Sequence, residues 1–164
     1  MKLPREIEAN PRHAAIAAVL ARDARALWSD GTLAVAHVPL DAPLEAALVA
    51  ASNARQLQRG LERIEQVLEG EQRGLDALHE KQGTAPANRA SRLLLAADEG
   101  SERFYRLVER LLLRHGDRLL GLRVEASPAR LSQAIFGRDL LVKAVLVSDR
   151  DGVTSVLRSL GPTP

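Results

Sequence analysis

The stretch LLLAADEGSERFYRLVERLLLRHGDRLLGLRV, residues 93–124, decides the fold class of this chain. It opens with a short apolar run over residues 93–97 and closes with a second over residues 119–124. Between them, residues 101–115 carry apolar side chains at helical spacing and stop at Gly116. A strand, a helix and a strand in this order predict a βαβ unit with parallel strands.

The same alternation continues toward the C-terminus. Ser127 and Pro128 are suited to begin a short helix that ends at Gly137. A third apolar run follows over residues 140–147, and a last helix is expected over about residues 153–160. We therefore expect a small, mostly parallel, three-stranded βαβαβα module. The second strand alternates in polarity and is expected at an edge, whereas the almost wholly apolar third strand is expected at the centre.

Two elements are expected near the N-terminus. Asn10 is a good helix cap, Pro11 fits the first helical position, and helical spacing continues as far as Trp28. Thr32 to Val38 is short, lies between Gly31 and Pro39, and predicts a strand over residues 32–38.

The longest periodic segment covers residues 42–82 and follows a heptad pattern broken only at Glu71. One continuous helix of this length would reach roughly 60 Å, well beyond a domain with a radius of gyration of about 15 Å. We expect such a helix to overhang its domain and to pair with a second copy. A helical hairpin bent at Gly70–Gly74 is the alternative. The expected oligomer interface consists of Leu57, Leu61, Ile64, Leu68, Leu75 and Leu78.

These expectations define the predicted architecture, an α/β protein with a helical N-terminal half. Residues 1–82 form a helical oligomerisation region, which includes the possible strand at 32–38. Residues 83–90, GTAPANRA, form a linker because they combine proline, glycine and small residues without periodicity. Residues 91–164 form the α/β module.

Charge is nearly balanced, with 23 basic and 21 acidic residues and a net charge of +2. Arginine outnumbers lysine 20 to 3, and its placement is more informative than its total. Clustered arginines suit phosphate, so non-specific nucleic-acid binding is an alternative function. With only four aromatic residues, recognition by base stacking is disfavoured. The arginines form two helical stripes, Arg55, Arg59 and Arg63, and Arg103, Arg106, Arg110 and Arg114.

The absence of cysteine excludes disulfides, thiol chemistry and cysteine-ligated metals. The chain also lacks a GxxxxGK loop, a GxGxxG turn and a GxSxG elbow, so no catalytic residue is assigned. The longest early apolar run, residues 14–21, is too short to span a bilayer. We expect a cytoplasmic protein without a membrane partner.

Acidic residues follow all three expected strands of the C-terminal module. Glu99-Gly100 after the first strand and Asp149-x-Asp151-Gly152 after the third resemble the acidic pattern of TOPRIM domains. The resemblance covers at most residues 92–160 and implies Mg²⁺-dependent phosphoryl transfer. It would make Glu99 the general acid/base and Asp149 with Asp151 the metal ligands.

The sequence thus supports three functional hypotheses of different classes. The first is a homodimeric interaction or scaffold protein whose α/β module binds a partner; an acidic protein is a further possible partner of the arginine stripes. The second is a non-specific nucleic-acid binder, and the third is a TOPRIM-like enzyme.

Overall fold

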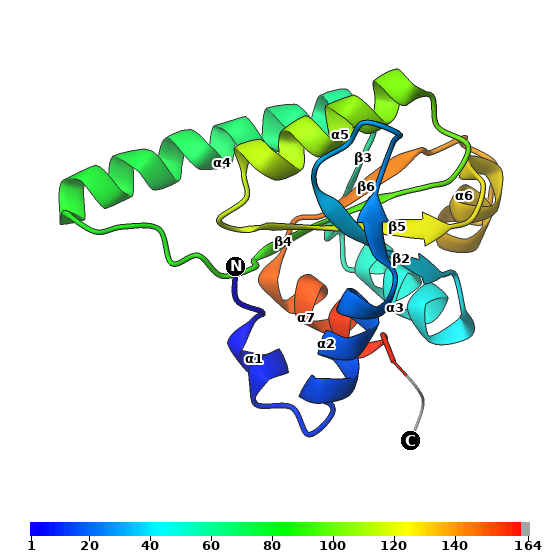
Figure 1. Cartoon of the computed structure of the whole chain (residues 1–164), viewed down its shortest axis with the longest axis horizontal. Helices are drawn as coiled ribbons and strands as arrows, with labels where there is room; N and C mark the ends of the chain where they lie inside the picture. The colour runs from blue at the N-terminus through cyan, green and yellow to red at the C-terminus, as the bar shows by residue number, and fades with distance from the viewer. Residues whose placement is uncertain (162–164) are drawn as a thin grey trace.

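The computed structural model describes residues 1–161 and shows a mixed α/β protein with helices on both faces of one open sheet (Figure 1). The six strands of the sheet are β1 (Ala24–Ala26), β2 (Ala34–Pro39), β3 (Leu57–Arg59), β4 (Arg92–Ala96), β5 (Leu119–Glu125) and β6 (Ala144–Val147). The helices are α1 (Arg5–Glu8), α2 (His13–Arg22), α3 (Ala42–Asn53), α4 (Leu61–Gln82), α5 (Glu102–Arg114), α6 (Pro128–Phe136) and α7 (Arg150–Arg158).

The strands lie in the order β1-β2-β5-β4-β6-β3. β2, β5 and β4 run parallel to one another, whereas β1, β6 and β3 are each antiparallel to the neighbour they pair with. The strands therefore come from both sides of the expected 83–90 linker. In that segment, Lys2 forms an isolated bridge with Arg89, which joins the start of the chain to the beginning of β4.

Two apolar layers hold the helices to the sheet because successive strand residues point to opposite faces. Leu93 and Leu95 of β4 pack with α1, α2, α3, α6 and α7, whereas Leu94 and Ala96 pack with α4 and α5. The central strands are consequently buried on both sides, which explains their nearly continuous apolar sequence.

The predicted strands at 32–38, 93–97, 119–124 and 140–147 are confirmed as β2, β4, β5 and the shorter β6. The expected position of one strand and the expected direction of another were wrong. β6 runs antiparallel to β4, and β5 lies inside the sheet between β2 and β4. The alternation of β5 wrongly predicted an edge strand, because its positions Gly121 and Arg123 face α5 and not solvent. Gly121 leaves room for the Leu112 side chain, and Arg123 lies over the Tyr105 ring.

The continuous helix expected over residues 42–82 is corrected to a helix, a strand and a second helix. Asp41 caps α3, and the chain leaves that helix through Arg55, which has φ 59°. β3 then pairs with β6, and Gly60, with φ 84°, starts α4. Such positive φ angles are easy for glycine and costly for other residues. The first helix also stops earlier than expected, at Arg22, because the chain turns into β1.

α4 extends beyond the rest of the molecule (Figure 1). Its first half packs on the sheet, while its C-terminal end projects beyond the sheet, at the left of Figure 1. Within the described part of the chain, no helix has the length and hydropathy needed to cross a membrane.

Candidate functional site

The carboxyl ends of β4 and β5 form the place where open α/β sheets most often bind ligands. The connection after β4 leads to α5 on one face, and the connection after β5 leads to α6 on the other. This edge is occupied by internal contacts. Arg123 Nε donates to Asp98 Oδ1 at 2.8 Å, its guanidinium lies 4.4 Å from the Tyr105 ring centroid, and the Tyr105 hydroxyl donates to Ala97 O at 2.7 Å. Asp98 therefore holds its loop in place.

The acids of the TOPRIM-like pattern are not brought together by the fold. Glu99 follows the carboxyl end of β4, whereas Asp149 and Asp151 follow β6, which runs the opposite way and ends beside the amino end of β4. The TOPRIM-like hypothesis placed these acids after strands of a mostly parallel module, whereas β6 runs antiparallel to β4. Over residues 1–161, no group of three metal-ligating side chains is arranged to hold an ion.

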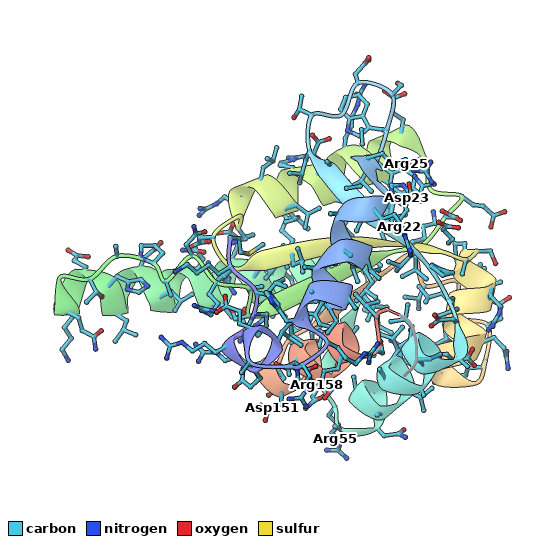
Figure 2. The ribbon with its side chains drawn as sticks, turned by 60° about the horizontal axis from the view of Figure 1, so that its bottom comes forward. Arg22, Asp23, Arg25, Arg55, Asp151 and Arg158 are labelled. Carbon is cyan, nitrogen blue, oxygen red and sulfur yellow. The ribbon has the colours of Figure 1, made fainter. Side chains whose placement is uncertain are left out.

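Asp149 instead caps α7. Its Oδ1 accepts hydrogen bonds from the backbone N–H groups of Asp151 and Gly152 at 2.9 and 3.2 Å, and from Gln56 at 3.3 Å. Figure 2 shows Asp151 on the α7 side of the molecule with Arg158, and both side chains are exposed. The Asp149 carboxylate therefore has a structural role in starting a helix.

The arginine stripe of α5 is preserved, but half of it has partners. Arg106 pairs with Glu102 at 2.7 Å and its guanidinium lies 4.8 Å from the Trp28 ring centroid. Arg114 lies 3.3 Å from Glu69 of α4. The other two members, Arg103 and Arg110, are exposed.

The second stripe is divided among a loop, a strand and a helix, because the expected long helix does not form. Arg55 lies in the loop after α3, Arg59 in β3 and Arg63 in α4. These residues do not form one helical face, and nucleic-acid binding through them stays a prediction.

The expected interface residues of the long helix fall into two groups. Ile64 and Leu68 are 0% exposed and pack on the sheet of their own chain, and Leu57 and Leu61 are partly buried there. Ile64 and Leu68 are therefore not available to a partner helix. The uncovered members are Leu75, which is half-buried, and Leu78, which is 45% exposed.

Leu75 and Leu78 lie on the end of α4 that we call the projecting segment, residues 73–82. Apart from the backbone hydrogen bonds of the helix itself, the contacts of this segment are local, as in the Gln72–Asp76 and His79–Thr84 hydrogen bonds. Its helix continues the apolar spacing of Ile64 and Leu68, and Leu78 is left exposed there.

A second feature is a groove of about 510 Å³ near the start of α4, which we call the Arg59–Lys143 groove. It is built from β3, the start of α4, α5 and the segment that enters β6. Its lining residues are Arg59, Gly60, Leu61, Phe104, Leu140, Leu141, Val142, Lys143 and Ala144. Apolar side chains dominate, both charged side chains are cationic, and no carboxylate lines it.

Arg59 belongs to one of the predicted arginine stripes, whereas Lys143 was not among the predicted site residues. A signal for Lys143 was present, since it is the one charged residue inside the apolar run 140–147. The contact of Phe104 with this region depends on packing between distant segments and has no local signal.

Two buried titratable side chains connect α5 and the residue that follows it to neighbouring elements. Glu109 of α5 accepts hydrogen bonds from the Trp28 indole, from Thr32 N at 2.9 Å, from the Thr32 hydroxyl at 3.1 Å and from Leu33 N at 3.2 Å. Burial alone would raise the pKa of Glu109, but these hydrogen bonds together lower it below 4.5.

His115 follows α5 and is 0% exposed. Its Nδ1 lies 3.3 Å from Gln72 Oε1, and its Nε2 lies 3.4 Å from Glu69 Oε1 without forming a hydrogen bond. Burial, followed by the charge of Arg118, lowers the pKa of His115 below 6.5, against the opposing effect of Glu69. Both residues therefore join parts of the fold.

No protein-family model matches the sequence, and no curated protein matches it. A solved structure of a protein with unknown function from Bacillus halodurans C is similar to this chain. The match has a TM-score of 0.45 and 19% sequence identity, and it covers 72% of this chain and 99% of the other.

Proposed function

We propose that this protein is a homodimeric interaction protein that self-associates through the projecting segment of α4. The observation that supports this proposal is the exposure of Leu78 beside the half-buried Leu75, at heptad spacing from Ile64 and Leu68. This spacing is the pattern with which one helix packs against another.

The energetics of the projecting segment favour a partner. A short helical end without tertiary contacts is marginal in water, and Gly70 and Gly74 each cost about 1 kcal/mol relative to alanine. Burying a leucine side chain contributes about 1.5–3 kcal/mol. A second copy supplies matching leucines, and a two-fold dimer is the commonest closed arrangement of identical subunits.

Light scattering coupled to size-exclusion chromatography tests the proposal. The wild-type protein is expected at twice its chain mass of 17.8 kDa. The double substitution Leu75→Glu and Leu78→Glu places four carboxylates in the dimer contact and should give monomers with unchanged circular dichroism.

Arg73→Glu is the matched control. It changes the charge by the same amount as the double substitution but lies on the opposite side of α4, two residues before Leu75. Dimers are expected to persist in this variant. A wild-type protein that is monomeric at all concentrations, or a double variant that keeps the dimer mass, would refute self-association through this segment.

A further inference from the structure

We propose that the Arg59–Lys143 groove binds a small organic anion that carries its charge on an apolar body. The volume of about 510 Å³ falls within the range of about 300–1,000 Å³ that is typical of small-molecule sites. This inference is independent of self-association, because the groove lies at the start of α4 and the projecting segment lies at its end.

The apolar part of the ligand is specified by the floor of the groove. Leu61, Phe104, Val142 and Ala144 come from α4, α5 and the entry to β6, and the last three are buried. The Phe104 ring offers an apolar surface that suits an aliphatic chain or a ring.

The charge of the ligand is specified by Arg59 and Lys143. Arg59 lies over the Phe136 ring, with its guanidinium carbon 5.4 Å from the ring centroid, which orients the cation without neutralising it. Lys143 is exposed, with no carboxylate among the lining residues. The nearby Asp139 carboxylate accepts a hydrogen bond from Leu141 N at 3.2 Å. An anionic head group would therefore supply the charge that the groove lacks.

Leu141 lies at the exposed rim of the groove. Its side chain is 64% exposed, and its backbone lies in the left-handed region with φ 49°. This backbone conformation is uncommon for a leucine. A bound apolar body would give this side chain a surface to pack on.

Isothermal titration calorimetry with three probes tests the proposal. Decanoate combines a carboxylate with an apolar chain, 1-octanol has an apolar chain without a charge, and inorganic phosphate has a charge without an apolar chain. Only decanoate is expected to bind measurably. The substitutions Arg59→Gln and Lys143→Gln should each weaken decanoate binding about three- to tenfold, since each removes one charge-assisted contact at an exposed site.

The control is Arg150→Gln, which removes an exposed cation at the start of α7, at the other end of β6. Its decanoate affinity should equal that of the wild type, and all three variants should keep the wild-type circular dichroism and melting temperature. Octanol or phosphate binding as tight as decanoate would overturn the proposal. It would also be overturned if decanoate failed to bind, or if the groove variants kept full affinity.

Discussion

The Glu109 carboxylate fastens the loop before β2 to α5. Its two oxygens accept from four donors, three of which belong to Thr32 and Leu33. Gly31 is part of the same arrangement, because a Cβ at this position would lie 3.0 Å from Glu109 Oε2. The loop and the helix are thus joined by one buried side chain.

Glu109→Ala should lower the free energy of unfolding by about 2–4 kcal/mol, because it leaves several donors of the loop without their acceptor. Urea denaturation followed by the fluorescence of Trp28, the one tryptophan, measures the change. Glu102→Ala, which removes an exposed acid of the same helix, should change stability by less than about 1 kcal/mol. Equal losses in the two variants would contradict the role assigned to Glu109.

His115 makes stability depend on pH in a defined direction. Because its pKa is lower in the folded protein than the ordinary 6.5, the unfolded chain takes up the proton first on acidification. The free energy of unfolding should therefore be highest above about pH 6.5 and decrease as the pH falls toward the folded-state pKa. Urea denaturation between about pH 7.5 and 5.5 measures this slope, which should flatten in His115→Gln. An unchanged slope in that variant would assign the effect to other groups.

The break between α3 and α4 shows why one element was mispredicted. The apolar spacing of residues 42–82 continues in phase through Leu57, so periodicity alone favours one helix. The structure uses Leu57 in β3, where it pairs with Val147, and this pairing partner lies 90 residues further along the chain. Long-range pairing overrode local periodicity here.

The glycines of α4 can be distinguished at the same scale. Gly74 lies inside the helix with nothing within 4 Å of an added Cβ, so Gly74→Ala should raise the free energy of unfolding by about 1 kcal/mol. Gly60 has φ 84°, so Gly60→Ala should lower it by about 1–2 kcal/mol. Thermal or urea denaturation of both variants measures the difference, and equal effects of the same sign would contradict this account.

Features of the fold that depend on local sequence pattern could be predicted from the sequence. The capping residues Asp41, Ser101 and Ser127 fit their helices, and the apolar character of β4 and β6 follows from burial on both faces. The direction of β6 was not accessible, because an apolar run reads the same in a parallel and an antiparallel strand. For that reason the sequence could not show that Glu99 lies far from Asp149.

At the scale of the whole molecule, one sheet combines strands from both halves of the chain. β2 pairs with β5, and β3 pairs with β6, so each of these strands has its neighbour on the other side of residues 83–90. The Arg59–Lys143 groove depends on this arrangement, because its two cations lie on β3 and at the entry to β6. No local stretch of sequence contains the groove.

This arrangement also sets a constraint on folding during protein synthesis. When the first 82 residues have left the ribosome, β1 and β2 can pair, but β3 has no partner and the sheet-facing side of α4 has nothing to cover it. The central strand β4 and its neighbours β5 and β6 follow only later, between residues 92 and 147. Such non-local pairing slows folding and leaves apolar surface exposed until the partner strands have been synthesised. The sheet is therefore completed only after the chain has been made as far as Val147, the last residue of β6.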